Sequence, residues 1–179
     1  MTLARPKSWQ QKQVDALRLG LYLALSVMFL NGCAGHKTKG ELISTGVDIS
    51  SYAQARMRAS GKRESTFSFP VLEIYRAGTL IYSGHESMEN ARVLKEFPAS
   101  IQNLPPRSNS PRLREIVDAF PDFKAKERAI MEGKESVILS ADLEDCDGCR
   151  LQEQALDEVG KKILQQPSVA ILRIHVSHP

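Results

Sequence analysis

In the middle of the chain, two short apolar runs favour strands, and the apolar positions after them follow the period of a helix. Residues 71–75 and 79–82 are short runs rich in β-branched and aromatic residues. The segment 76–78 between them ends in glycine and is typical of a tight turn. Residues 86–97 place apolar side chains at helical spacing before Pro98. We therefore expect a β-hairpin followed by a helix.

The last third of the chain shows the same two kinds of pattern in another order. Residues 136–143 predict a strand, residues 149–165 an amphipathic helix and residues 168–176 a second strand. Because the connection is one helix long, the pattern predicts a parallel, right-handed βαβ unit. The apolar positions that we expect the helix to bury are Leu151, Ala155, Leu156, Val159 and Ile163.

The remaining segments carry weaker patterns. Residues 49–62 predict a helix that ends near Gly61. Residues 112–131 predict a second helix, broken near Pro121. Residues 103–111 contain three prolines and two serines and predict a long surface loop.

The N-terminal segment has the pattern of a secretory signal. Residues 1–18 are polar and basic, and residues 19–30 are uncharged and mostly apolar. Twelve residues of helix span about 18 Å, which is short of the ~30 Å hydrocarbon core of a bilayer. A stable membrane span is therefore not expected from this segment.

The end of this segment, Leu30-Asn31-Gly32-Cys33, resembles the lipobox of bacterial lipoproteins. The resemblance implies a signal peptide over residues 1–32 and lipidation of Cys33, which would anchor the chain in a lipid bilayer. Residue 34 is not Asp, and in that family this favours the outer membrane, facing the periplasm. We expect a lipidated tether over residues 33–48 and the folded domain over residues 49–179.

Composition excludes two classes of protein, nucleic-acid binders and disulfide-stapled scaffolds. The chain has 24 Lys+Arg and 21 Asp+Glu. Four of the basic residues and one of the acidic residues lie in residues 1–32, which leaves equal numbers in the rest. The folded part therefore lacks the basic excess of a nucleic-acid binder. Three cysteines are too few for a disulfide-stapled scaffold.

The main chemical signal is Cys146-Asp147-Gly148-Cys149 at the start of a predicted helix. This spacing allows both sulfurs to meet in a disulfide, and the helix start stabilises a thiolate on Cys146. Acidic residues around it oppose that effect: Asp142, Glu144, Asp145 and Asp147. If the pair is redox-active, we expect a reductant-like or nearly inert couple and not a strong oxidant. A disulfide that only staples the helix start is the alternative.

Strand, Cys-x-x-Cys, helix and strand are also the order of the redox half of thioredoxin-like proteins, which this segment resembles. Phe69-Pro70, the hairpin and the following helix resemble the other half of that fold. The resemblance implies a three-layer α/β sandwich in which a cis-proline, Pro70 here, faces the cysteines across a substrate groove. The two halves stand in reversed order, so we expect a circularly permuted thioredoxin-like domain.

A metal site is a further alternative. The two strands of a parallel βαβ unit end at the same edge of the sheet, which brings His175 and His178 toward the cysteine loop. Cys146, Cys149, His175 and His178 would complete a tetrahedral zinc set.

We expect the function to be thiol–disulfide exchange with envelope proteins that bear thiols or disulfides. Cys146 would attack, Cys149 would resolve, Phe69 and Pro70 would shape the groove, and no cofactor is required. The alternative is a non-catalytic lipoprotein that serves as a binding or assembly component of a secretion or conjugation apparatus.

Overall fold

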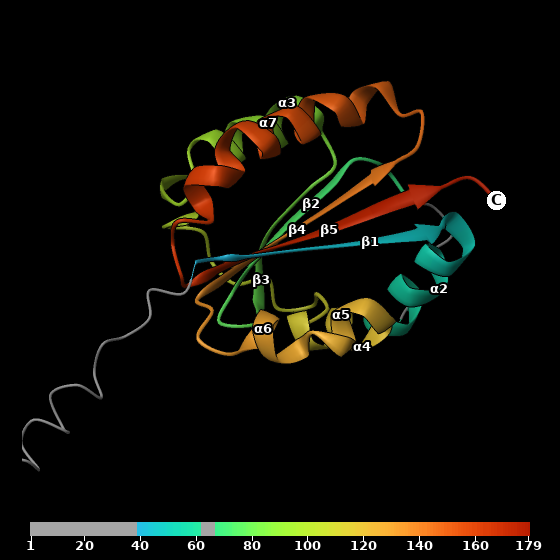
Figure 1. Cartoon of the computed structure of the whole chain (residues 1–179), viewed down its shortest axis with the longest axis horizontal. Helices are drawn as coiled ribbons and strands as arrows, with labels where there is room; N and C mark the ends of the chain where they lie inside the picture. The colour runs from blue at the N-terminus through green and yellow to red at the C-terminus, as the bar shows by residue number, and fades with distance from the viewer. Residues whose placement is uncertain (1–38, 62–66) are drawn as a thin grey trace, which may run out of the picture. The chain divides into compact units, whose positions relative to one another are not determined.

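The computed structural model describes residues 39–61 and 67–179, in which five strands form one mixed sheet (Figure 1). The strands, in sheet order, are β1 (Glu41–Asp48), β5 (Val169–Ser177), β4 (Ser136–Leu143), β2 (Val71–Arg76) and β3 (Thr79–Gly84). The helices are α2 (Ile49–Ser60), α3 (Ser87–Lys95), α4 (Leu113–Ala119), α5 (Pro121–Ala125), α6 (Glu127–Met131) and α7 (Asp147–Ile163), with a 3-10 turn, η1, at Ala99–Ile101.

The predicted hairpin is confirmed. Strands β2 and β3 pair in antiparallel fashion, and Ala77 and Gly78 make the turn between them. Both residues have positive φ, 48° and 76°, as in the two-residue turns that match the twist of a hairpin. Glycine takes this conformation without a steric penalty, which explains its place in the turn.

The predicted βαβ unit is also confirmed, and it joins the hairpin in one sheet. Strands β4 and β5 are parallel neighbours connected by α7. Strand β2 pairs antiparallel to β4, with Val71 opposite Ala141. The start of β2 therefore lies beside the end of β4, where the cysteine loop begins.

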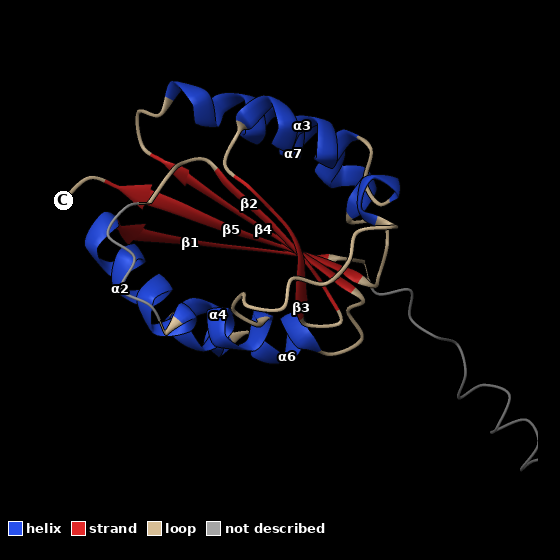
Figure 2. Cartoon of the chain, turned by 180° about the vertical axis from the view of Figure 1, so that it is seen from behind, coloured by secondary structure: helices blue, strands red, loops and turns tan. Residues whose placement is uncertain are grey.

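Helices cover both faces of the sheet, as Figures 1 and 2 show from opposite sides. Helices α3 and α7 pack on one face, and α2, α4, α5 and α6 pack on the other. Alternation along β4 explains the division, because Val137 and Leu139 join the core under α2 and α4, and Ile138 joins the core under α3 and α7. The described residues thus form a three-layer α/β sandwich.

The tether prediction for residues 33–48 is wrong over its second half. Glu41–Asp48 form strand β1, which pairs in parallel with β5 along its whole length. Only Ile43 and Thr45 of this edge strand are buried, and one of the two is polar, so the strand shows little hydrophobic pattern in the sequence. The pairing partner lies about 130 residues away in the sequence, so the local pattern carries no signal of it.

The helical predictions hold in position but differ in detail. Residues 112–131 form three short helices, with a break before Pro121 as expected and another at Lys126. Helix α7 begins two residues earlier than predicted, so the cysteine motif lies within its first turn. Leu151 is 49% exposed, although its spacing predicted a core position.

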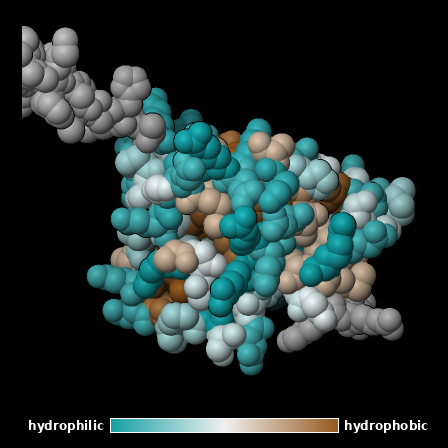
Figure 3. Space-filling view, turned by 90° about the horizontal axis from the view of Figure 1, so that it is seen from below, coloured by the Kyte–Doolittle hydropathy of each residue, from teal (hydrophilic) through white to brown (hydrophobic). Residues whose placement is uncertain are grey.

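The surface carries its apolar side chains in scattered places. Figure 3 shows one face that is largely hydrophilic, with hydrophobic residues in small separate areas. Among the described residues, the large apolar side chains that are exposed are Leu42, Met88, Leu104 and Leu151. Single exposed apolar residues of this kind are normal on a globular domain.

Candidate functional site

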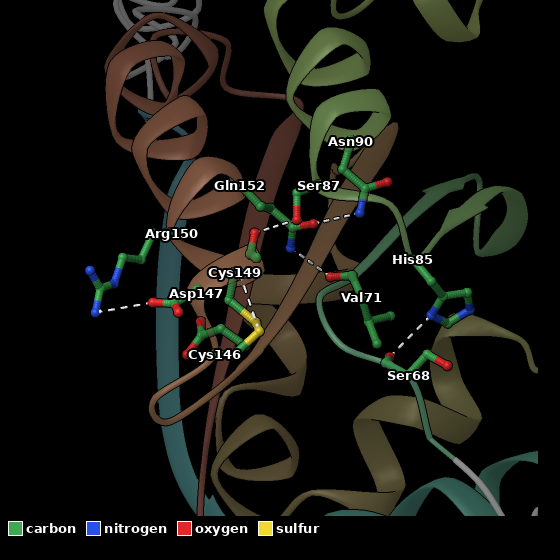
Figure 4. The surroundings of a disulfide bond; sticks show 12 residues. Ser68, Val71, His85, Ser87, Asn90, Cys146, Asp147, Cys149, Arg150 and Gln152 are labelled. Carbon is green, nitrogen blue, oxygen red and sulfur yellow. Dashed lines mark hydrogen bonds and ion pairs between the residues drawn. A yellow bond between two sulfur atoms is a disulfide. The ribbon is translucent and has the colours of Figure 1, made fainter.

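The two cysteines form a disulfide at the N-terminus of α7 (Figure 4). Strand β4 ends at Leu143, and a tight turn delivers Cys146 to the N-cap position of the helix. Asp145 in that turn has a φ of 61°, a left-handed conformation that Asp and Asn tolerate better than most residues. The Cα atoms of Cys146 and Cys149 lie 5.3 Å apart, within the range that a disulfide requires.

The two sulfurs differ in accessibility and in hydrogen bonding. Cys146 is partly exposed, whereas Cys149 is 2% exposed. The backbone N–H of Cys149 donates to Cys146 Sγ over 3.2 Å, so the outer sulfur occupies the place of an N-cap acceptor. After reduction, this N–H and the helix terminus favour a thiolate on Cys146.

A buried network of neutral side chains holds the first turns of α7 against the rest of the sheet (Figure 4). Gln152 Nε2 donates to the Val71 carbonyl over 2.8 Å and lies 2.9 Å from Ser140 Oγ. Asn90 of α3 donates to Gln152 Oε1 over 2.5 Å. Both amide side chains are at most 1% exposed. The network fixes the position of the cysteine helix relative to β2, β4 and α3.

A second tie joins the cysteine motif to α3. Ser87 Oγ donates to the carbonyl of Gly148, which lies between the two cysteines. At the other end of the network, Asn90 also contacts the end of the hairpin, where its amide donates to the Gly84 carbonyl over 3.3 Å. A Cβ at Gly84 would collide with Asn90 Oδ1 and with Tyr82, so only glycine fits this close approach.

Pro70 lies at the sheet edge at which the cysteine loop begins. The Phe69–Pro70 peptide bond is cis, as the resemblance implied for Pro70, and a second cis bond joins Phe97 and Pro98. Pro70 is buried and precedes Val71, whose carbonyl accepts the bond from Gln152. Its part in a substrate groove stays a prediction.

Phe69 faces a different neighbour. Its ring packs against that of Tyr52 in α2, with 5.2 Å between the ring centroids. A polar cavity of about 360 Å³ lies nearby, lined by residues that include Ser68, Val71 and His85. Phe69, Pro70 and the two cysteines are all absent from the lining of this cavity, so it is not the groove that the resemblance implies.

The structure does not assemble the zinc set of Cys146, Cys149, His175 and His178. The two sulfurs are bonded to each other, which removes both thiolate ligands. His175 Nδ1 lies 2.9 Å from Asp142 Oδ1 on the neighbouring strand. His178 lies beyond the end of β5 and is exposed. The strands do end at one edge as expected, but Asp142 takes the position beside His175.

The acidic residues near Cys146 are less uniform than the sequence suggested. Asp142 is 7% exposed and faces His175, and Asp147 forms an ion pair of 3.5 Å with Arg150. Glu144 and Asp145 are exposed to solvent, which screens their charges. The carboxylates therefore oppose a Cys146 thiolate less strongly than four uncompensated charges would.

Sequence reasoning missed the residues that support the site. The apolar pattern predicted that Leu151 would be buried in α7, but its neighbour Gln152 is buried instead. Asn90 is likewise buried in α3. The sequence did contain one indication: a polar residue next to the apolar face of the most clearly amphipathic helix. A buried amide needs partners, so that position predicts a network, although it does not identify the partners.

No described helix is both long enough and apolar enough to cross a bilayer. In comparisons with known proteins, the chain matches no family model, no curated protein and no solved structure.

Proposed function

We propose that this chain is a thiol–disulfide exchange protein in which Cys146 attacks and Cys149 resolves. The observation that carries the proposal is the asymmetry of the disulfide: Cys146 is partly exposed and capped by a backbone N–H, whereas Cys149 is buried behind it. A nucleophilic thiol needs both access and a stabilised thiolate. A resolving thiol needs only to lie next to the first one.

The chemistry transfers two electrons and needs no cofactor. In the reduced protein, the Cys146 thiolate attacks a substrate disulfide, forms a mixed disulfide and expels one substrate thiolate. Cys149, once deprotonated, then attacks Cys146 Sγ, which releases the second substrate thiolate and leaves the Cys146–Cys149 disulfide. The substrate is reduced and the protein is oxidised, and the reverse sequence oxidises a substrate dithiol.

The fold that we propose for this chemistry is thioredoxin-like, with its two halves in reversed order. The unit β4-α7-β5 supplies the redox half, and the unit β2-β3-α3 supplies the half that carries Pro70. The sheet order β1-β5-β4-β2-β3 and the packing of α3 and α7 on one face support the proposal. Reversal of the two units in the sequence changes the connections and leaves the neighbours in the sheet unchanged.

The surroundings of Cys146 favour a reductant-like couple. Exposed carboxylates at Glu144 and Asp145 raise the free energy of the thiolate and oppose the helix terminus. A less stable reduced form gives up its electrons more readily, so the couple is weakly oxidising. The expected substrates are envelope proteins that contain disulfides.

Membrane attachment through Cys33 is part of the proposal. Cys33 and the lipobox lie outside the described residues. Their support is the sequence pattern of residues 1–33. The outer membrane as the location is supported by residue 34, which is not Asp. Mass spectrometry of the mature chain should find acyl groups on residue 33, and Cys33→Ser should abolish them. An unacylated mature chain would contradict lipidation.

Mixed-disulfide trapping with a matched pair of variants tests the exchange chemistry. Folded Cys149→Ser should form a stable mixed disulfide with a small disulfide such as oxidised glutathione, because Cys146 can attack and nothing can resolve. Folded Cys146→Ser should react far more slowly, because its remaining sulfur is buried. Both variants need the Cys33→Ser background, so that no other thiol contributes.

Failure of both variants to react while folded would overturn the proposal. The disulfide would then be a structural staple, and a non-catalytic binding or assembly lipoprotein would become the better account. The ties from Ser87 and Gln152 to the cysteine helix would serve that function as well, because they would hold a rigid surface.

A further inference from the structure

Three potential metal ligands from separate elements converge, and one of them lies on α7 one helical turn after the disulfide. They are Asp142 on β4, His175 on β5 and Glu153 on α7. One donor atom from each residue can be chosen so that all three lie within 4.8 Å of one another. None of the three takes part in the disulfide or in the network around Gln152.

Strand pairing and helix packing explain the convergence. Asp142 and His175 are opposite one another in the parallel register of β4 and β5, so both side chains rise from the same face of the sheet. That face is the one covered by α7. Glu153 lies one helical turn after Cys149, which directs it toward the same place.

The electrostatics of this cluster are incomplete without a cation. Asp142 is 7% exposed, and its Oδ2 is buried without a hydrogen-bond partner among the described residues. An unpaired buried carboxylate oxygen carries a large desolvation cost. Glu153 forms no ion pair with any described residue. Arg173, the nearest cation along β5, is paired with Asp157 at 2.7 Å.

We propose that Asp142, Glu153 and His175 bind a divalent transition-metal ion, with Zn²⁺ as the expected occupant. One imidazole and two carboxylates suit Zn²⁺ better than Ca²⁺ or Mg²⁺, which prefer oxygen ligands alone. Tetrahedral Zn²⁺ with ligands at ~2.0–2.1 Å separates its donor atoms by about 3.4 Å. Donor atoms up to 4.8 Å apart must therefore close, and the 2.9 Å contact between His175 Nδ1 and Asp142 Oδ1 must open if both of these atoms bind the ion. His175 and Glu153 have this freedom because both are at least partly exposed.

A cavity lies beside two of the three ligands. A cavity of about 470 Å³ is lined by Asp142 and His175, together with Asp48 and Glu144. Its other carboxylates make the approach acidic, which raises the local concentration of cations. Three protein ligands leave the fourth tetrahedral position for a solvent or substrate atom entering from this cavity.

Equilibrium dialysis with Zn²⁺ tests the site on the full-length, oxidised chain in the Cys33→Ser background, with any affinity tag removed. The unsubstituted background should bind one Zn²⁺ per chain. Asp142→Asn and His175→Gln should each weaken binding at least about tenfold. His178→Gln is the matched control: it removes an exposed imidazole three residues from His175 and should leave binding unchanged.

Further variants keep the test decisive. Glu153→Gln is partly exposed and should weaken binding without unfolding the domain, in case Asp142→Asn fails to fold. The double variant Cys146→Ser, Cys149→Ser should retain binding, because the site uses no sulfur. Absence of stoichiometric Zn²⁺ binding would overturn the proposal. So would equal affinity after His175→Gln, or loss of binding in His178→Gln or in the double cysteine variant.

Discussion

Strand β2 carries a buried polar cluster on each of its faces, and the two clusters differ in charge. Facing α2, Glu73 accepts hydrogen bonds from the Arg56 guanidinium at 2.9 and 2.5 Å and from the Tyr75 hydroxyl at 2.7 Å. Facing α7, the Val71 carbonyl accepts from Gln152 in a network of neutral groups. Both clusters attach a helix to the same strand, but only the neutral one lies beside the disulfide.

Because of this difference, the ionic cluster stabilises the fold without acting on the reactivity of the cysteines. Burial alone would lower the pKa of Arg56, but the hydrogen bond and the charge of Glu73 outweigh it, so the pKa rises and the guanidinium stays charged. An ionised pair next to the cysteines would shift the stability of a thiolate. Because the support of α7 is uncharged, the helix terminus and the surface carboxylates are left to determine the reactivity of Cys146.

The largest effect is expected from Glu73→Gln, which leaves the Arg56 charge buried without an opposite charge. The free energy of unfolding should fall by about 3–5 kcal/mol. Urea denaturation measures this loss. Glu89→Gln, which breaks an ion pair on the surface of α3, should change stability little and is the control. A loss below ~1 kcal/mol in Glu73→Gln would show that the ionic cluster does not hold α2 in place.

A smaller loss, about 1–3 kcal/mol, is expected from Gln152→Ala, because Ser140 and the Val71 carbonyl lose a buried partner. The same change should make Cys149 easier to alkylate after reduction, which Glu73→Gln should not do. Gln154→Ala, on the exposed side of α7, is the matched control. If both glutamine variants behave alike, the neutral network does not position the cysteine helix.

The ionic cluster should also make the fold less stable at high pH. Burial, followed by the charge of Glu73, raises the pKa of Tyr75 well above its ordinary value of 10.0. Above pH 10 the unfolded chain loses this proton while the folded chain keeps it, so stability falls as the pH rises, by up to about 1.4 kcal/mol per unit. Below pH 10 this contribution is constant. Tyr75→Phe should flatten the decline in denaturation series between pH 8 and 11, and an unchanged slope would contradict the assignment.

The smallest effect is expected at the surface of the redox site. Replacement of Asp145 and Asp147 by Asn should lower the pKa of the Cys146 thiol by less than about one unit, because both carboxylates are exposed and Asp147 is paired with Arg150. Asn also keeps the left-handed conformation at residue 145. The rate of alkylation against pH measures the shift. Glu158→Gln, near the far end of α7, should leave the profile unchanged.

Local sequence patterns predicted the hairpin, the strands β4 and β5 and the helix between them. The strands are short apolar runs because they are largely buried, and the helix carries apolar side chains at helical spacing. It could not predict β1, whose pattern is that of a polar edge strand and whose pairing with β5 is decided by tertiary contacts. The extent of the tether was wrong for this reason.

The candidate site divides in the same way. Cys146 and Cys149 could be identified because their spacing and the following helix are local features. The partners of Gln152 come from three other elements, and the pairing of Asp142 with His175 depends on the register of two strands. No local pattern encodes that register, so the network around Gln152 and the pair of Asp142 and His175 could be identified only from the fold.

Site-resolved alkylation of the reduced, folded chain tests the central claim most directly. The full-length chain in the Cys33→Ser background would be labelled for increasing times at neutral pH, and mass spectrometry would quantify the label on each cysteine. The account predicts that Cys146 reacts at least about tenfold faster than Cys149, and that the two rates converge in denaturant. Labelling of Cys149 first, or of neither cysteine until the domain unfolds, would contradict it.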